Sequence, residues 1–423
     1  MDINIPYGIG FLTLNGSNLP INAILEAKFP PTDRSMTEES IISKALIQPI
    51  SSSRLCELAS GITKVLIVIS DHTRVVPTSI TLPLLLSEIR QQNPEIKVKI
   101  IVATGLHRSP SREEIKKQVG RQVFEQEDIS VHCATSLENL VYKGQLPSGN
   151  ELWVNRLADW ADLVVADGLI EPHFFAGFSG GGKSILPGIA GKTSIITNHS
   201  YPMIAHLSSR CGVLEGNDIH RDMCAAAEMV KLKFILNVVL NEQKKVVAAF
   251  AGHYNQAHIA GCEFLRPYVE KSTNEADVVI TSNGGYPLDQ NLYQAVKSID
   301  TAAKCVREGG VIICVSECRD GNGGKSFVEW FNKARNPEEI LVEMAKIQPI
   351  DTVQDQWQVQ ILAKAMCRAR IIMVSSRKIV QDIGSMGMAY CEDIGSAVRL
   401  ALRMKPDTEG IIIIPDGVNI IVS

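Results

Sequence analysis

Short runs of consecutive apolar residues recur along the chain, with helical patterns between them. The runs span residues 64–69, 97–102 and 163–166, and later residues 277–281, 310–316, 370–375 and 410–415. Because these runs carry apolar residues on both faces, they predict strands that are buried on both faces. Helical spacing of apolar residues is found in residues 81–92, 111–120, 337–346 and 358–367. This alternation predicts mostly parallel sheets with helices on both sides.

The length and order of these patterns predict more than one domain. At roughly 150 residues per domain, 423 residues correspond to two or three domains. Strand patterns at 234–240 and 246–250 flank a polar turn and predict a hairpin at the edge of the first sheet. A helical stretch, residues 252–274, then leads to the second set of strands. We therefore expect two α/β domains: residues 1–268, with a Rossmann-like, mostly parallel sheet, and a smaller one, residues 269–423.

The composition argues against several classes of partner. The formal net charge is −4, and charged residues make up 21% of the chain, so no strong positive field would attract nucleic acid or an anionic membrane. The apolar runs are too short for a membrane helix, which needs about 20 residues. The first residues lack the pattern of a secretion signal. The ten cysteines include no CxxC pair, which is typical of reduced thiols in a cytoplasmic protein.

Polar clusters follow three strands of the first half. Asp71, His72, Thr73 and Arg74 follow the first strand, residues 104–108 with His107 follow the second, and residues 167–175 with His173 follow the third. Functional residues in parallel α/β sheets gather just past the carboxyl ends of strands. A surface loop with a hydrogen-bonded histidine would explain any one cluster. Three clusters at successive strands indicate one shared site.

Residues 177–184 match the pattern G-x-x-x-x-G-K-[ST] of phosphate-binding P-loops. A P-loop follows its strand directly and opens a long helix. Here residues 171–173 intervene, and the prolines and glycines of residues 187–191 would break a helix early. The glycines would still let backbone amides approach an anion beside Lys183. A P-loop-like nucleotide-binding protein is therefore kept as an alternative of a different class.

Four segments carry a more specific signal: residues 171–191 (EPHFFAGFSGGGKSILPGIAG) followed by Asn198 and His199, residues 71–74 (DHTR), residues 104–108 (TGLHR) and residues 285–297 (GYPLDQNLYQAVK). In this order, over nearly the whole chain, they resemble the nickel-pincer-nucleotide lactate racemase family. Two positions depart from the family pattern. Val75 stands where the family usually has Pro, and Gly182 stands where it often has Arg. Neither change removes a group that does chemistry.

The resemblance implies a cofactor and a set of roles. The cofactor is a pyridinium-3,5-bisthiocarboxylic acid mononucleotide that holds Ni(II), linked covalently to Lys183, with His199 as the nickel ligand. His107 and His173 are implied as paired acid/base residues, and the site as lying in the cleft between the two domains. The other implied residues are cofactor-binding Asp71, His72, Thr73 and Arg74, and substrate-binding Arg74, Tyr293, Gln294 and Lys297.

The implied activity is an isomerase reaction, the racemisation of D- and L-lactate by proton-coupled hydride transfer through pyruvate. The residue chemistry agrees with it. Two histidines suit a proton that must leave from either enantiomer, and hydride transfer avoids a carbanion at a poorly acidic Cα–H. Arg74 and Lys297 are cations suited to a carboxylate. Another 2-hydroxy acid (short-chain aliphatic, malate, hydroxyglutarate or a sugar acid) is the alternative substrate, although Tyr293, without an added Arg nearby, favours a small one.

The resemblance and the sequence also lead to expectations about partner proteins and about the histidines outside the motifs. The family's cofactor is made by other proteins, so cofactor-maturation proteins are expected partners, and the sequence does not indicate an oligomeric state. The histidines outside the motifs are expected to be structural or on the surface: His132, His206, His220, His253 and His258. Trp357 either reaches the cofactor or packs in the core.

Overall fold

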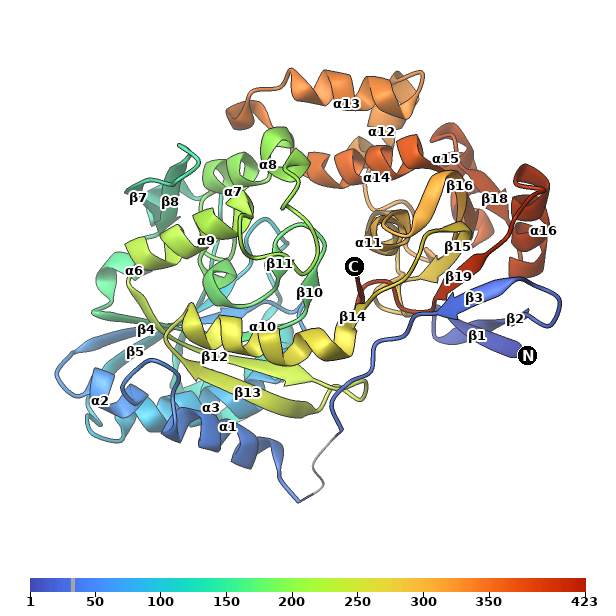
Figure 1. Cartoon of the computed structure of the whole chain (residues 1–423). Helices are drawn as coiled ribbons and strands as arrows, with labels where there is room; N and C mark the ends of the chain where they lie inside the picture. The colour runs from blue at the N-terminus through green and yellow to red at the C-terminus, as the bar shows by residue number, and fades with distance from the viewer. Residues whose placement is uncertain (32–34) are drawn as a thin grey trace. The chain divides into compact units, whose positions relative to one another are not determined.

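The computed structural model describes residues 1–31 and 35–423, and the chain divides into two compact units (Figure 1). The mid-chain unit comprises Phe29–His199 and His206–Tyr268, and the terminal unit comprises Met1–Lys28, Ser200–Ala205 and Val269–Ser423. This division differs from the predicted domain 1–268 at residues 1–28 and 200–205, which belong to the terminal unit. Residues 1–28 belong to the terminal unit because β3 (Ile21–Ile24) pairs in parallel with β19 (Ile411–Ile414).

A six-stranded sheet of order β13-β12-β9-β4-β5-β6 forms the centre of the mid-chain unit. Its strands are β4 (Lys64–Ser70), β5 (Lys97–Ala103), β6 (Asp128–Val131), β9 (Leu163–Leu169), β12 (Leu232–Leu240) and β13 (Val246–Gly252). All neighbours pair in parallel except β12 and β13, which form the predicted antiparallel hairpin at the edge. The three strands predicted in the first half and the alternating α/β class are confirmed.

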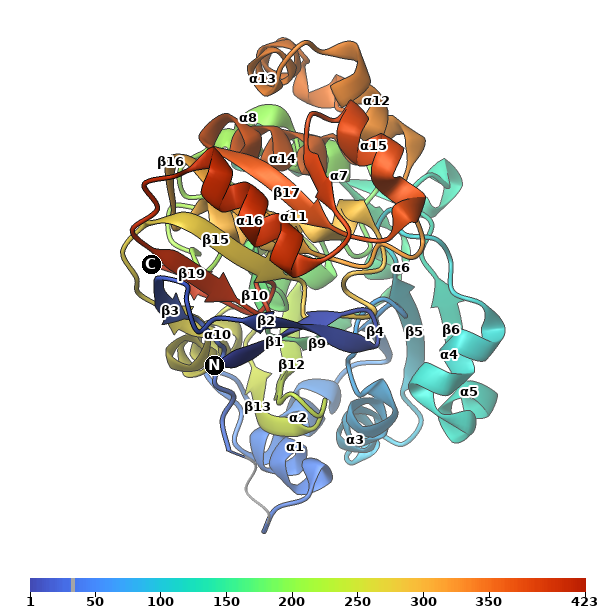
Figure 2. The same ribbon diagram turned by 90° about the vertical axis from the view of Figure 1, so that its right-hand side faces the viewer.

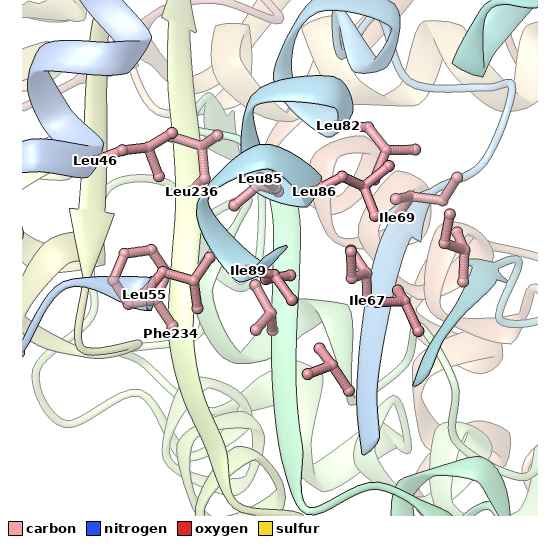
Figure 3. Packing of buried hydrophobic residues seen from close by; sticks show 14 of the residues in the cluster. Leu46, Leu55, Ile67, Ile69, Leu82, Leu85, Leu86, Ile89, Phe234 and Leu236 are labelled. Atoms are coloured by element: carbon pink, nitrogen blue, oxygen red, sulfur yellow. The ribbon is translucent and has the colours of Figure 1, made fainter. Parts of the chain in front are cut away.

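Helices cover both faces of this sheet, as the uninterrupted apolar strands predict. One face packs against α1 (Glu38–Ile47), α2 (Leu55–Ala59) and α3 (Thr78–Arg90). Figure 3 shows the apolar layer there, with Leu82 and Leu85 of α3 lying near Ile69 and Leu236 of the strands. The other face carries the 3-10 helix Gly181–Ser184, α9 (Asp218–Met229) and α10 (Gln256–Val269). The core therefore fixes the sheet whose strand ends bear the polar clusters.

The terminal unit has a second six-stranded sheet, entirely parallel, of order β18-β17-β16-β15-β19-β3. Besides β3 and β19 it contains β15 (Ala276–Ser282), β16 (Val306–Val315), β17 (Ala369–Val374) and β18 (Ala389–Cys391). One face packs against the hairpin of β1 (Asp2–Tyr7) and β2 (Gly10–Asn15) and against α16 (Ile394–Met404), as Figure 2 shows. The other face bears α11 (Leu292–Ala303) and α14 (Gln356–Arg368), and α13 (Pro337–Ala345) packs on α14.

The helices predicted at 337–346 and 358–367 are α13 and α14, and those predicted at 81–92 and 111–120 are α3 and α4 (Arg112–Val119). The α4 helix begins with the capping box that its sequence predicts. The Ser111 hydroxyl accepts from the Glu114 amide at 3.2 Å, and the Glu114 carboxylate accepts from the Ser111 amide at 2.8 Å. Within the described residues, no helix combines the length and the apolar character needed to span a membrane.

Candidate active site

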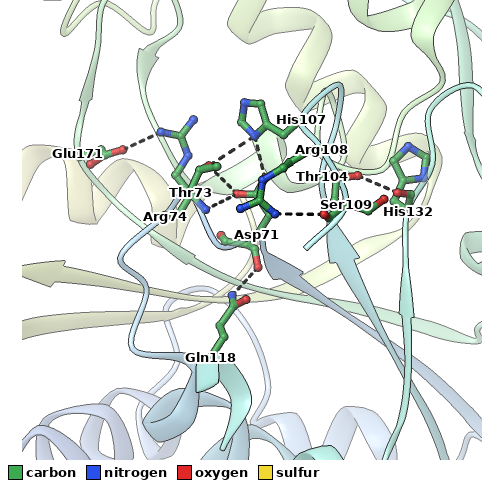
Figure 4. A network of polar contacts seen from close by, with 11 residues as sticks. Asp71, Thr73, Arg74, Thr104, His107, Arg108, Ser109, Gln118, His132 and Glu171 are labelled. Atoms are coloured by element: carbon green, nitrogen blue, oxygen red, sulfur yellow. Dashed lines mark hydrogen bonds and ion pairs between the residues drawn. The ribbon is translucent and has the colours of Figure 1, made fainter. Parts of the chain in front are cut away.

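Asp71 directly follows β4 and is only 2% exposed. Its Oδ1 accepts hydrogen bonds from the Thr73 amide at 3.1 Å and the Thr73 hydroxyl at 2.6 Å, and its Oδ2 lies 2.7 Å from Nδ1 of His107 (Figure 4). Burial by itself raises the pKa of the Asp71 carboxyl, but the bonds with His107 and Thr73 outweigh burial and lower that pKa below its ordinary value. The site therefore contains an ionised carboxylate with a fixed orientation.

His107 lies on the turn that follows β5, beside Asp71 because Ser70 of β4 pairs with Ala103 of β5. The turn is held by hydrogen bonds from the His107 amide to the Thr104 carbonyl and from the Gly105 amide to the Gly188 carbonyl. The imidazole is 50% exposed. Since an ionised carboxylate can only accept, Nδ1 of His107 carries a hydrogen. In the neutral ring, Nε2 is then the nitrogen able to take up a proton.

Arg74 is linked to the next cluster through Glu171, a residue that the sequence analysis did not select. Arg74 Nη1 lies 3.7 Å from Glu171 Oε1, and the Ser179 hydroxyl lies 3.4 Å from the same oxygen. The Ser179 amide also donates to the Glu171 carbonyl at 2.9 Å. Glu171 thus joins the loop after β4 to the glycine-rich loop. The only sequence feature that could have marked Glu171 is its position as an isolated acidic residue two positions before His173.

His173 lies on a tight hairpin of two short strands, β10 (Pro172–His173) and β11 (Gly177–Phe178). Its Nδ1 accepts a hydrogen bond from the Ala176 amide at 3.2 Å. The neutral ring therefore carries its hydrogen on Nε2, which is the opposite tautomer to that of His107. Its ring centroid lies 4.6 Å from that of Phe175, whose own centroid lies 5.0 Å from that of His199. The packing of Phe175 connects the predicted acid/base residue to the predicted metal ligand.

The glycine-rich loop is packed tightly against the elements behind it. Gly180 and Gly181 have φ of +87° and +56°, a region that favours glycine. The Gly181 amide donates to Oδ1 of Asn237 at 2.8 Å. A Cβ built on Gly181 would lie 2.7 Å from Cγ of His258. The glycines thus permit close packing, and the Gly181 amide is engaged by a protein side chain.

Gly182 has a similar reason to be small. A Cβ built there would lie 2.5 Å from the Met223 carbonyl oxygen of α9. The helix that begins at Gly181 is a 3-10 helix that ends at Ser184, so the predicted early break is confirmed. Because a P-loop opens a long α-helix, this geometry does not favour the nucleotide-binding alternative. The loop instead presents Lys183 from a rigid support.

His199 is the C-cap of α7 (Lys192–Asn198) and is 6% exposed. Burial, and to a smaller extent the charge of Lys183, lower the pKa of His199 to about 3. The imidazole is therefore neutral, the form that binds metals. The preceding Asn198 donates to Asp222 of α9 at 3.4 Å. In the part of the chain that the structure describes, no three His, Cys, Asp or Glu side chains gather so that they could hold a metal ion.

The remaining predicted residues lie in the terminal unit, at the beginning of α11. Asn291 caps this helix by accepting from the Gln294 amide at 2.9 Å. Gln294 and Lys297 lie three positions apart and therefore share a helix face. The Tyr293 hydroxyl donates to Oδ1 of Asp355 at 3.0 Å, and burial followed by Asp355 raises the pKa of Tyr293. Tyr293 thus has its hydroxyl engaged within its own unit.

Comparisons with known proteins agree over both units. Residues 7–212 match the sequence family described as lactate racemase N-terminal domain, and residues 271–422 match lactate racemase C-terminal domain. The chain is 45% identical to the lactate racemase of Thermoanaerobacterium thermosaccharolyticum over 421 residues, covering 100% of this chain and 99% of the relative. It is 39% identical to that of Lactiplantibacillus plantarum over 420 residues, covering 99% of each.

Solved structures extend the agreement to the fold. The lactate racemase apoprotein of T. thermosaccharolyticum matches with a TM-score of 0.97, 45% identity and full coverage of both chains. A Thermotoga maritima protein matches with a TM-score of 0.66 at 19% identity, covering 93% of this chain and 100% of that one, and this likeness concerns the fold alone. Since both halves of the sequence and the whole fold match the same family, the chain belongs to the lactate racemase family.

Proposed function

We propose that the protein is a lactate racemase, an isomerase that interconverts D- and L-lactate. Family membership over the whole chain supports the activity. The observation that carries the assignment of roles is the pair formed by Asp71 and His107, 2.7 Å apart at the ends of two neighbouring parallel strands. A buried carboxylate that holds an exposed imidazole by Nδ1 is an arrangement suited to general-base catalysis.

The two histidines divide the proton transfers. His107 accepts the substrate hydroxyl proton on Nε2 while its Nδ1–H continues to donate to the Asp71 carboxylate. His173 donates a proton only from its protonated ring, because the neutral ring that accepts from the Ala176 amide would become an imidazolate if it lost one. A protonated imidazole carries hydrogens on both nitrogens, so the contact of His173 Nδ1 with the Ala176 amide opens when His173 takes up a proton. The two histidines therefore begin a turnover in different protonation states, one neutral and one protonated.

Cations and amides of the chain are assigned to the substrate carboxylate. Arg74, positioned by Glu171, is the guanidinium of the mid-chain unit proposed for this contact. Tyr293, Gln294 and Lys297 are proposed as substrate residues from α11. Arginine suits a carboxylate because its planar fork can donate two parallel hydrogen bonds.

The proposed cofactor is a nickel pincer nucleotide attached to Lys183, with His199 as nickel ligand, and the residues fit it. His199 supplies one neutral imidazole, which suffices where a small molecule provides the other ligands of the metal. His72 Nδ1 is buried without a hydrogen-bond partner among the described residues, which supports a ligand contact near Asp71 to Arg74. When bound, the cofactor supplies an acceptor for the Cα hydride.

The cysteines and the proposed cofactor suggest a cellular compartment and partner proteins. All ten cysteines lie among the described residues and are free thiols, which supports a reducing, cytoplasmic compartment. The proposed cofactor requires maturation proteins, which are the proposed partners during assembly of the holoenzyme.

Intact-mass and nickel analysis of protein produced with the maturation proteins tests the cofactor roles. Lys183→Ala should abolish the covalent mass increase, whereas the exposed Lys192→Ala should retain it. His199→Ala should keep the mass increase and lose nickel, whereas the exposed His206→Ala should keep both. An unchanged adduct in Lys183→Ala would overturn the assignment of the lysine.

Racemisation assays test the two histidines. Both half-reactions are needed for turnover, so His107→Ala and His173→Ala should each lower net racemisation by about two to four orders of magnitude. One enantiomer should still be oxidised to the bound keto acid in each variant. A variant that racemises like wild type would remove that histidine from the mechanism.

A further inference from the structure

Two helices behind the glycine-rich loop each carry a histidine and a cysteine four residues apart. They are His220 and Cys224 on α9 and His258 and Cys262 on α10. The two imidazoles stack with centroids 5.8 Å apart, and each cysteine Sγ lies 3.4 or 3.5 Å from Nε2 of its own histidine. Among the described residues this cluster does not bring three ligands to a metal position. Its role has to be sought in the loop that it supports.

His258 is the member of the cluster that contacts the loop. Its Nε2 lies 2.9 Å from the Ser179 carbonyl oxygen, which can only accept, so Nε2–H donates. The ring lies directly against Gly181, where a Cβ would be 2.7 Å from Cγ of His258. The side chain is 2% exposed, and burial lowers the pKa of His258 to about 4. The ring is therefore neutral at physiological pH.

The loop is held on both sides of Gly180. His258 binds the Ser179 carbonyl before it, and Asn237 binds the Gly181 amide after it. The 3-10 helix then closes with a hydrogen bond from the Lys183 amide to the Gly180 carbonyl at 3.2 Å. Two short anchors thus fix the backbone immediately before Lys183.

Electrostatics place the lysine charge near the same histidine. After burial, the positive charge of Lys183 contributes to lowering the pKa of both His258 and His199. The ammonium therefore lies within electrostatic reach of both rings, one under the loop and the other at the end of α7. A change in the side-chain conformation of His258 would shift the loop and so move Lys183 relative to His199.

We propose that His258 is a positioning residue for Lys183: its Nε2–H holds the Ser179 carbonyl and its ring supports Gly181, so that the loop presents the lysine in one orientation. The inference rests on the proposed role of Lys183 as the attachment point of the cofactor. His258 itself contacts neither substrate nor cofactor in this scheme.

Amide hydrogen exchange of the apoprotein tests the positioning directly. His258→Phe keeps a ring of similar size but removes the donor, and His258→Gln restores a donor at the same reach. Losing one hydrogen bond and leaving a buried acceptor unsatisfied should accelerate exchange of the amides of residues 181–188 about tenfold. In His258→Gln the rate should stay within about threefold of wild type, since the bond is remade. Exchange in β4 and β5 should be unchanged in both variants.

Cys262→Ala is the matched control, because Cys262 is equally buried beside His258 and has no bond to the loop. Equal loop exchange in His258→Phe and Cys262→Ala would overturn the proposal, as would a His258→Gln variant as fast as His258→Phe. Should His258→Phe fail to fold, His258→Asn replaces it, since its amide is too short to reach Ser179. Equal protection in the Asn and Gln variants would then refute the proposal.

A second readout separates this proposal from the proposed function. In protein produced with the maturation proteins, the fraction carrying the mass increase should fall several-fold in His258→Phe and recover in His258→Gln. If wild type carries no adduct, the role of Lys183 fails. The exchange experiment on apoprotein still decides whether His258 positions the loop.

Discussion

Replacing Asp71 by Asn should prevent His107 from acting as a general base while leaving its imidazole in place. The amide of Thr73 donates to Oδ1 of Asp71 at 3.1 Å, so in the variant the amide oxygen takes that position. The NH2 group then faces His107 at the place where Oδ2 now accepts from Nδ1 at 2.7 Å. Nδ1 must accept, and the hydrogen of the neutral imidazole moves to Nε2. The atom that should take the hydroxyl proton is then already protonated.

The magnitude follows from the loss of a correctly protonated base. General-base removal costs about two to four orders of magnitude in rate, and the same carboxylate-to-amide change beside a catalytic histidine in serine proteases costs roughly four. At about 1.4 kcal/mol per tenfold, the barrier rises by about 3–5 kcal/mol. We expect the loss in kcat and a smaller change in KM, because Arg74 is untouched. The assay is enantiomer-specific detection of D-lactate formed from L-lactate, normalised to nickel and covalent adduct.

Thr73→Val provides the control. It removes the 2.6 Å hydroxyl bond to the carboxylate but leaves the acceptor in front of Nδ1, so the rate should fall by less than about tenfold, as expected for one hydrogen bond. If Asp71→Asn retained a third or more of the wild-type kcat, the tautomer argument would be wrong. A loss of adduct in Asp71→Asn would show that the residue serves the cofactor instead.

Three further predictions concern stability and binding. Burial raises the pKa of Asp167 from 3.8 to about 7, so between these pH values the folded state holds a proton that the unfolded state releases. Wild type should therefore lose up to roughly 4 kcal/mol of unfolding free energy between about pH 4 and 7. In urea unfolding, Asp167→Asn should lack this pH dependence, and parallel pH profiles for the two proteins would contradict the prediction. Gly182→Ala should lower stability by about 1–3 kcal/mol in the same urea assay, because its Cβ would meet the Met223 carbonyl of α9, and unchanged unfolding would show that the loop has room. Glu171→Gln should change the KM for lactate by at most about fivefold with little change in kcat, because its ion pair with Arg74 is 3.7 Å long and partly exposed; a kcat loss beyond tenfold would assign Glu171 a more direct role.

The fold could be predicted where local pattern and burial agree. A run that is apolar at every position, such as residues 65–69, predicts a buried strand, and in the structure these residues form a buried parallel strand. The assignment of residues 1–28 to the terminal unit was beyond the sequence, because the pairing of β3 with β19 joins segments at opposite ends of the chain. The strand β6 was also missed, since the run Asp128–Val131 is short and half polar.

The sequence allowed us to predict which strand ends carry the candidate site, but not the hydrogen-bond geometry within it. The topology of parallel strands brings Asp71 and His107 together, and the motifs marked both. Which nitrogen of each imidazole carries the hydrogen depends on the Asp71 carboxylate and the Ala176 amide, contacts that no spacing in the sequence encodes. The departure at Gly182 likewise acquires a reason only from its approach to α9.

The fate of the substrate's Cα hydrogen tests the central claim most directly. Nickel-loaded protein is incubated in ordinary water with L-lactate deuterated at Cα, and the D-lactate formed is isolated and analysed by mass spectrometry. A lactate racemase that moves the hydroxyl proton through its histidines and the Cα hydrogen as hydride should yield D-lactate that retains the deuterium. Absence of D-lactate from nickel-loaded protein would contradict the proposed activity. Loss of the label to water at a rate near turnover would contradict the hydride mechanism.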